Sequence, residues 1–142
     1  MQWDAGPQAG FSAGEPWLPL TPDWVCRNVE AMSDDPASIL TLYRRLLGLR
    51  RDHGALSVGG YRTVALAPEH AEQVFAYERA HDGAVLRVVL NFGGTGQSLP
   101  LEAGWAGHVL LSTHPGRTGA RERGQLRLAP DEGVVLRLDG PA

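Results

Sequence analysis

The sequence predicts an α+β chain in which one amphipathic helix is followed by a small antiparallel β-sandwich. Two observations support this prediction: residues 35–53 have the apolar spacing of a helix, and residues 57–139 break into short strand-like segments separated by turn signals. With 142 residues, 43% of them hydrophobic, the chain can bury a core without disulfides or metal. The single cysteine, Cys26, excludes an internal disulfide framework and a cysteine-ligated zinc cluster.

The helix is predicted over residues 36–53. Asp35 is a favourable N-cap, and Pro36 suits the first helical position, where its missing N–H costs nothing. The apolar residues of this segment recur at helical spacing and form one stripe: Ile39, Leu40, Tyr43, Leu46 and Leu47. Gly54 is expected to end the helix in a left-handed conformation. Because the stripe is wider than a surface helix needs, we expect it to pack against a large apolar partner.

Strands are predicted at Tyr61–Leu66, Gln73–Glu78, Ala84–Phe92, His108–Ser112, Leu126–Leu128 and Val134–Leu138. Asp82-Gly83 is expected to close a hairpin as a type I′ turn, because this pair tolerates positive φ. The segment 130–133 is expected to form another turn before the last strand. The strand that begins at Ala84 is apolar almost throughout, which is typical of a strand covered on both faces.

Residues 1–34 are rich in Gly, Pro and Trp and follow neither helical nor strand periodicity. Irregular segments of this length are usually functional or disordered. Disorder fits poorly with the aromatic residues Trp3, Phe11, Trp17 and Trp24, so we expect a long packed loop separated from the body on which it packs.

The same loop is the candidate binding site. Trp3 and Phe11 suit stacking on sugar faces, and Gln2 and Asp4 carry groups that hydrogen-bond hydroxyls beside those rings. The alternative, to which the residues give equal weight, is that the aromatic side chains only anchor the loop to its scaffold.

No self-contained catalytic constellation is present in the sequence. Asp34-Asp35 and Asp131-Glu132 are neighbours along the chain, so their side chains diverge, and we interpret both pairs as caps or turns. The five histidines share no metal-ligand spacing, so no metal site is expected. No cofactor is expected either.

Charge and hydropathy make nucleic-acid and membrane partners unexpected. The net charge is −3, and the short basic segment Arg117 to Arg127, interrupted by Glu122, is interpreted as a solvated loop. No apolar run approaches the ~20 residues of a membrane span, and the first residues lack the features of a secretory signal. We therefore expect a cytoplasmic protein.

Several motifs together carry a family resemblance: Met1-Gln2-Trp3-Asp4, Ala9-Gly10-Phe11-Ser12, Pro16-Trp17, Asn28-Val29-Glu30, Asp35-Pro36, Tyr43-Arg44 and Leu49-Arg50. In this order they resemble the α-glucosidases and oligo-1,6-glucosidases of glycoside hydrolase family 13, the α-amylase family. In that family the first motifs lie on the loop after the eighth strand of a (β/α)8 barrel. The last barrel helix and a β-sandwich called domain C follow.

The resemblance implies two regions. Residues 1–54 correspond to the end of the catalytic (β/α)8 barrel, with a long loop and a final helix over 36–53, and residues 55–142 to the C-terminal β-sandwich. It further implies that the pocket rim is lined by Gln2, Trp3, Asp4 and Phe11. The three catalytic carboxylates of the family precede the Met-Gln-Trp-Asp motif, so no catalytic residue is expected here, and the chain alone is expected to be inactive.

The leading functional prediction is therefore the C-terminal part of an α-glucosidase-like enzyme that hydrolyses short α-glucosides with retention. Oligosaccharide is expected to bind only in the context of the complete barrel. The alternatives are a stand-alone, non-catalytic β-sandwich that binds carbohydrate or a protein partner, and a gene remnant. Met1 coincides with the methionine of the motif, which would follow from a misassigned start codon or a split gene. The sequence leaves open the linkage, isomerase or transglycosylase activity, and the oligomeric state.

Overall fold

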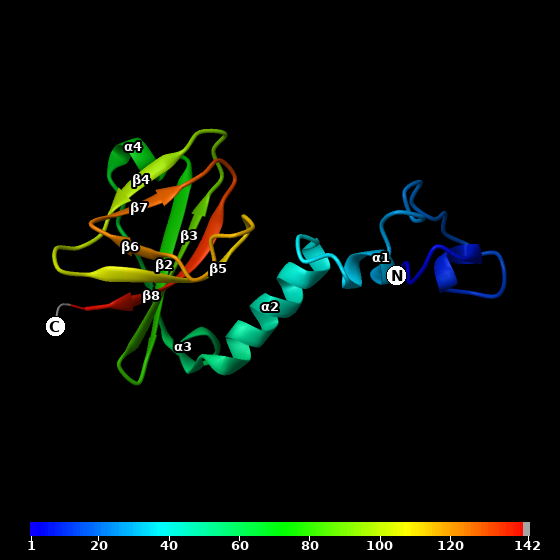
Figure 1. Ribbon diagram of the computed structural model, residues 1–142, viewed down its shortest axis with the longest axis horizontal. Helices are drawn as coiled ribbons and strands as arrows, with labels where there is room; N and C mark the ends of the chain where they lie inside the picture. Colours follow the sequence, from blue (N-terminus) through cyan, green and yellow to red (C-terminus); the bar gives the residue numbers. More distant parts are fainter. Residues whose placement is uncertain (141–142) are drawn as a thin grey trace. The chain divides into compact units, whose positions relative to one another are not determined.

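The computed structural model describes residues 1–140 and divides into two compact units, residues 1–46 and the part that begins at Leu47 (Figure 1). In chain order the elements are η1 (Pro7–Gly10), α1 (Val29–Ser33), α2 (Ile39–Asp52), α3 (Gly54–Ser57), β1 (Gly60–Thr63), α4 (Pro68–Ala71), β2 (Val74–His81), β3 (Ala84–Asn91), β4 (Gln97–Pro100), β5 (Ala106–Ser112), β6 (Arg121–Arg123), β7 (Gln125–Leu128) and β8 (Gly133–Asp139).

The second unit is an antiparallel β-sandwich. One sheet has six strands in the order β1-β2-β3-β8-β5-β6, and the other consists of β4 and β7 (Figure 1). Both sheets contribute to one core, whose buried members are Val74, Ala76, Val89, Leu99, Leu101, Val109, Leu126, Leu128, Val134, Leu136 and Leu138. The predicted fold class is confirmed.

The β2–β3 hairpin forms as predicted. Asp82 and Gly83 have φ values of 47° and 77°, as a type I′ turn requires. In β3, Leu86 and Val89 point to opposite faces of the sheet and are both fully buried. The expectation of a strand covered on both faces is therefore confirmed. The turn before β8 is also confirmed, with Asp131 at a φ of 53°.

Two strands were not predicted, β4 and β6. Part of the arginine-rich segment interpreted as a loop is in fact strand, because Arg121 and Arg123 lie in β6. Arg127, at the end of the segment, lies in β7, within the strand predicted at Leu126–Leu128. β6 is one of the two edge strands of the six-stranded sheet, and its backbone pairs with β5. Edge strands tolerate exposed charges because one side faces solvent, so charge alone did not distinguish strand from loop here.

The helix α2 begins at Ile39, so the predicted start at Pro36 was wrong. Ser38 is the residue whose hydroxyl accepts a hydrogen bond from the backbone N–H of Thr41 at 3.1 Å. Asp35 instead closes the preceding turn, because its Oδ1 accepts from the N–H of Ala37 at 2.8 Å. Both are N-cap residue types, and the chain uses them in succession.

Gly54 does not end α2 in a left-handed conformation, which corrects the second prediction for this helix. It opens the short helix α3 instead, and His53 before it has extended backbone angles. A side chain at Gly54 would place Cβ 2.7 Å from Cδ2 of His81. The glycine therefore permits close packing of α3 against the β2–β3 hairpin.

The apolar stripe of α2 is exposed. The helix contains no buried residue, and Ile39 and Tyr43 are each 60% exposed. The expectation that this stripe packs on a large apolar partner stays a prediction.

Candidate functional site

The candidate site residues lie on one tight loop of the first unit. The backbone N–H of Trp3 donates to the carbonyl of Ala9 at 2.8 Å, and that of Asp4 donates to the same oxygen at 3.4 Å. Phe11 follows two residues after Ala9 and donates its N–H to the carbonyl of Gln8 at 3.1 Å. The backbone segments that carry Trp3 and Phe11 are thus tied together.

The opposite side of the motif is tied to α1. The carbonyls of Gln2 and Trp3 accept hydrogen bonds from the N–H groups of Val29 and Glu30 at 3.0 and 2.9 Å. The side-chain amide of Gln2 donates to the hydroxyl of Thr21. The loop is therefore held on two sides by the first unit alone.

The start of α1 is fixed by Asn28, which is fully buried and has its polar atoms satisfied. Its Oδ1 accepts from the N–H of Ala31 at 2.8 Å, and its Nδ2 donates to the carbonyls of Trp24 and Val25 at 3.0 and 3.2 Å. An asparagine at the N-cap therefore holds the helix to which the motif is bonded. Its sequence signal is the Asn28-Val29-Glu30 motif.

A left-handed turn faces the motif. Gln8, Ala9 and Gly10 have successive φ values of 54°, 54° and 64°. Left-handed backbone costs an ordinary L-residue about 1–2 kcal/mol, so two non-glycine residues in a row are strained. Ala9 is fully buried, and its N–H donates to the carbonyl of Gly6 at 3.0 Å.

The carboxylate of Asp4 closes this turn. Its Oδ1 accepts from the N–H of Gly6 at 2.8 Å. A Cβ on Gly10 would lie 2.6 Å from the Cγ of Asp4, so the carboxyl group covers the Cα of this glycine. Sequence reasoning missed this turn, although the glycine of the Ala9-Gly10 motif is its signal.

The four candidate residues differ in how much of each side chain is exposed and free of hydrogen bonds within the loop. Trp3 is 49% exposed and Phe11 is 59% exposed, so both rings have surface available for contact. Gln2 and Asp4 are half-buried, and each has a side-chain atom bonded within the loop. The structure thus brings the four residues onto one loop with two exposed rings and two internally bonded polar groups.

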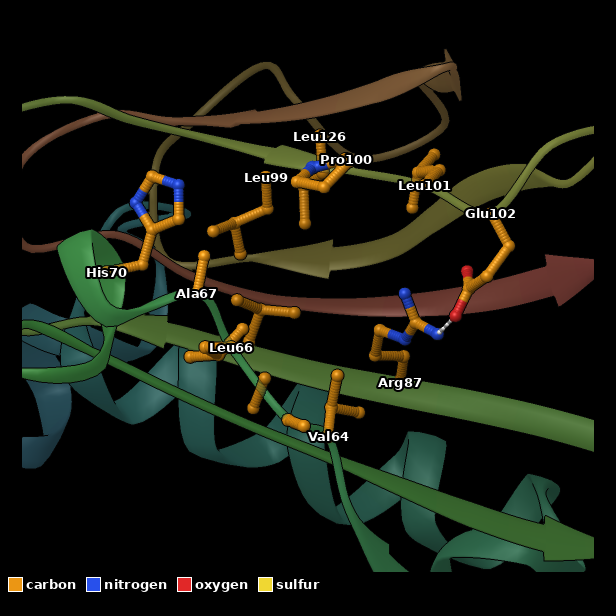
Figure 2. A pocket seen from close by; sticks show the side chains of 13 residues that line it. Val64, Leu66, Ala67, His70, Arg87, Leu99, Pro100, Leu101, Glu102 and Leu126 are labelled. Carbon is orange, nitrogen blue, oxygen red and sulfur yellow. Dashed lines mark hydrogen bonds and ion pairs between the residues drawn. The ribbon is translucent and has the colours of Figure 1, made fainter.

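The second unit contains a pocket of about 250 Å³ at the edge of the sandwich (Figure 2). It lies between the segment 64–67 and β4, and the Arg87–Glu102 ion pair is at one end. The other lining residues that Figure 2 labels are Val64, Leu66, Ala67, His70, Leu99, Pro100, Leu101 and Leu126. No Trp, Tyr or Phe side chain lines it, so it lacks the stacking platform of a sugar site.

Two buried ionic clusters of the second unit were also not predicted. In the first, burial would lower the pKa of Arg87, but hydrogen bonds to Glu102 and Glu78 outweigh burial and raise that pKa. In turn, the hydrogen bond from Arg87 lowers the pKa of Glu102. Arg62 completes the first cluster, because its Nε donates a hydrogen bond to Glu78 at 3.1 Å.

The second cluster surrounds Glu132. Burial alone would raise the pKa of its carboxyl, but hydrogen bonds from the Ser112 hydroxyl and the Ala129 N–H, together with the charge of Arg117, lower it. Arg117 also donates to Glu122 at 2.8 Å. Each cluster contains one buried carboxylate, Glu78 or Glu132, that is bonded to arginine, and all of its bonding partners belong to the second unit.

Within residues 1–140 no group of three or more His, Cys, Asp or Glu side chains is arranged to hold a metal ion. Within the same residues no helix is long and apolar enough to cross a membrane.

Comparison with known families decides the identity of these units. The model of the α-amylase catalytic domain matches residues 1–59, and a model described as a domain of unknown function (DUF3459) matches residues 60–135. The chain belongs to the α-amylase family. It corresponds to the end of the catalytic domain and the β-sandwich that follows, as predicted.

Individual relatives match almost the whole chain. An oligo-1,6-glucosidase of Parageobacillus thermoglucosidasius is 32% identical over 143 residues, which are 99% of this chain and 25% of the relative. A trehalose-6-phosphate hydrolase of Bacillus subtilis is 31% identical over 146 residues, again 99% of this chain and 25% of the relative. The chain thus spans about a quarter of the length of these two relatives.

The fold of the chain also matches part of a solved structure. The trehalulose synthase of Pseudomonas mesoacidophila matches with a TM-score of 0.83 and 32% identity, over 97% of this chain and 24% of the synthase. The two family models meet between residues 59 and 60, whereas the compact units part between Leu46 and Leu47. A domain boundary between residues 54 and 55 stays a prediction.

Proposed function

We propose that this chain is the C-terminal part of an α-glucosidase-like glycoside hydrolase that acts on short α-glucosides. The observation that supports this most is the alignment of 99% of the chain with relatives named oligo-1,6-glucosidase and trehalose-6-phosphate hydrolase. The match to the end of the α-amylase catalytic domain supports it independently.

Within that enzyme, the chain contributes contacts and not the bond-breaking groups. Retaining hydrolysis uses two carboxyl groups about 5–5.5 Å apart on either side of the glycosidic bond. The most buried carboxylates described, Glu78 and Glu132, are both bonded to arginines, which keeps them away from such chemistry. In this proposal the catalytic acids of the whole enzyme lie in the part that corresponds to the remaining three quarters of the relatives, which this chain does not span.

The contacts are assigned to the loop of the first unit. In this proposal Gln2, Trp3, Asp4 and Phe11 belong to the rim of the substrate pocket, where the oligosaccharide binds once the barrel is complete. Loops at the C-terminal face of a (β/α)8 barrel are where such enzymes build their sites. The exposed rings of Trp3 and Phe11 support this assignment.

The experiment that tests the proposal begins with the native protein. An antibody against the β-sandwich, applied to extract of the source cells, is expected to detect a product several-fold larger than 15.3 kDa. The protein recovered with that antibody is expected to release glucose from isomaltose. A product of only 15.3 kDa, or a larger one that releases no glucose from isomaltose, maltose or trehalose-6-phosphate, would overturn the proposal. A stable 15.3 kDa product would favour the stand-alone binding module.

We further propose a cytoplasmic location. Cys26 is the single cysteine of the sequence, so these residues carry no disulfide framework of the kind that small secreted domains use. Detection of the protein in the culture medium or periplasmic fraction, and not in the cytosol, would contradict this location.

A further inference from the structure

We infer that Asp4 is a positioning residue, which holds Trp3 and Phe11 in place for contact with a sugar ring and does not itself bind the sugar. The inference rests on the proposed function, because it divides roles within the same candidate site. It departs from the expectation that Asp4 bonds sugar hydroxyls directly.

The first argument is that the carboxylate of Asp4 is already engaged. One oxygen accepts the N–H of Gly6 at 2.8 Å, and the carboxyl group lies over the Cα of Gly10, where a Cβ would come within 2.6 Å of Cγ. A carboxylate that packs on the backbone of its own turn has less surface left for a ligand than the rings beside it. Trp3 and Phe11, in contrast, are about half exposed.

The second argument is the strain of the turn that Asp4 closes. Gln8 and Ala9 are non-glycine residues in left-handed conformation, and Gly10 continues it. Such strain persists only where surrounding contacts over-determine the backbone, and it concentrates at sites that bind ligands. Here the over-determining contacts come from the motif: the N–H groups of Trp3 and Asp4 both bond the carbonyl of Ala9.

The third argument is what the strained turn fixes. Phe11 follows the turn directly, and its N–H bonds the carbonyl of Gln8. Trp3 is bonded to the carbonyl of Ala9 in the middle of the turn. The carboxylate of Asp4 supports this turn beside those backbone bonds, through the N–H of Gly6 and over the Cα of Gly10. Its loss is expected to loosen the backbone that carries both aromatic residues.

A double-mutant cycle in the full-length protein that carries this sequence separates positioning from contact. The variants are Asp4→Ala, the ring variant Trp3→Ala/Phe11→Ala and the triple variant, and the readout is KM and kcat for isomaltose. We expect Asp4→Ala to raise KM about tenfold, which corresponds to about 1.4 kcal/mol of binding. If Asp4 acts through the two rings, the triple variant has the KM of the ring variant within about twofold. A KM that rises a further tenfold in the triple variant would show an independent contact and overturn the inference.

Two more variants sharpen the cycle. Asp4→Asn keeps the oxygen that accepts the N–H of Gly6 and is expected to retain the wild-type KM within about twofold, since the contact that matters is not the charge. Gly10→Ala places a Cβ against the carboxyl group and is expected to reproduce the KM of Asp4→Ala. Asp34→Ala is the matched control, because Asp34 is an exposed acid of the same unit.

A second measurement does not depend on catalysis. With 5-fluorotryptophan incorporated into the full-length protein, the fluorine resonance of Trp3 is assigned by its loss in Trp3→Phe. Asp4→Ala and Gly10→Ala are expected to shift or broaden that resonance, while Asp4→Asn and Asp34→Ala leave it in place. An unchanged Trp3 resonance in Asp4→Ala would overturn the inference whatever the kinetics show. A wild-type protein without glucosidase activity would instead refute the proposed function, and the resonance would still report whether Asp4 positions Trp3.

Discussion

Glu78 and Arg87 face each other across the β2–β3 hairpin, and both side chains are buried in the sandwich. Arg87 donates from Nε and Nη2 to a single carboxylate oxygen of Glu78, at 2.9 and 2.6 Å. Its Nη2 also donates to Glu102 at 2.6 Å. Because burial of two charges is costly, the intact pair is expected to add little to the free energy of unfolding. Removal of only one partner is expected to lower that free energy strongly, because it leaves the other charge buried without its partner.

Replacement of one member of this pair is expected to be much worse than replacement of both. Arg87→Met leaves Glu78 buried without its main partner and is expected to lower the free energy of unfolding by about 3–5 kcal/mol. The double variant Arg87→Met/Glu78→Met is expected to recover most of that loss, because an apolar pair fills the same space. Urea unfolding followed by circular dichroism measures both. The expectation fails if the double variant is as unstable as the single one.

Arg62 provides the matched control for that experiment. It also bonds Glu78, but its side chain is 75% exposed. Because the Arg62 end of the pair is in solvent and Glu78 keeps its bonds to Arg87 when Arg62 is replaced, Arg62→Met is expected to lower the free energy of unfolding by only about 1 kcal/mol.

Glu132 is expected to be the second sensitive carboxylate of the sandwich. Its oxygens accept from the Ser112 hydroxyl at 2.6 Å, from the Ala129 N–H at 2.8 Å and from Arg117. Glu132→Ala leaves these donors without their acceptor, so we expect a loss of about 3–5 kcal/mol in the free energy of unfolding. Asp131→Asn, at the exposed neighbouring position, is expected to stay within about 0.5 kcal/mol of the wild type in the same urea titration.

The same residue predicts how stability depends on pH. Because the hydrogen bonds and the charge of Arg117 lower the pKa of Glu132 in the folded chain, its contribution is complete above the ordinary glutamate pKa of 4.5. It is lost as the pH falls below that value through the folded-state pKa. We expect the urea midpoint of Glu132→Gln to fall less steeply between pH 5 and pH 3 than that of the wild type. Parallel curves would show that Glu132 does not contribute to acid unfolding.

The buried ion pair Glu78–Arg87 could have been predicted from the sequence, although it was not. Asp82-Gly83 was recognised as a type I′ turn, and that turn fixes the register so that Glu78 pairs with Arg87. Strand alternation then places Glu78 on the same face as Val74 and Ala76. The hairpin therefore predicts a buried ion pair, but the charges were passed over because charged residues are usually exposed.

The helix boundary shows a different limit. Asp35-Pro36 carries good start signals, yet α2 begins only after Ser38. Two successive N-cap residues satisfy the local rules equally well, and only the hydrogen bonds decide between them. Gly54 was read as a stop signal because glycine tolerates left-handed backbone, whereas the structure uses its lack of a Cβ.

The candidate site residues were predicted from their motif, and their contact with sugar stays a prediction. Trp3 and Phe11 could be selected because aromatic residues on a Gly- and Pro-rich loop suit sugar contacts. The left-handed conformation of Gln8 and Ala9 could not be foreseen, because neither residue type favours it. What imposes it is a set of hydrogen bonds from a motif several residues earlier, which local propensity does not describe.

Gly59 provides the sharpest test of packing between α3 and the large sheet. A Cβ at this position would lie 2.8 Å from both the Cα of Ala55 and the carbonyl oxygen of Ala80, which are backbone atoms that cannot rotate away. Gly59→Ala is therefore expected to lower the free energy of unfolding by about 1–3 kcal/mol, the usual cost of overpacking. Gly60→Ala is the matched control, because its nearest neighbour would lie 4.0 Å away, and we expect it to stay within about 0.5 kcal/mol of the wild type. Equal urea midpoints for the two variants would mean that α3 does not pack this tightly on β2.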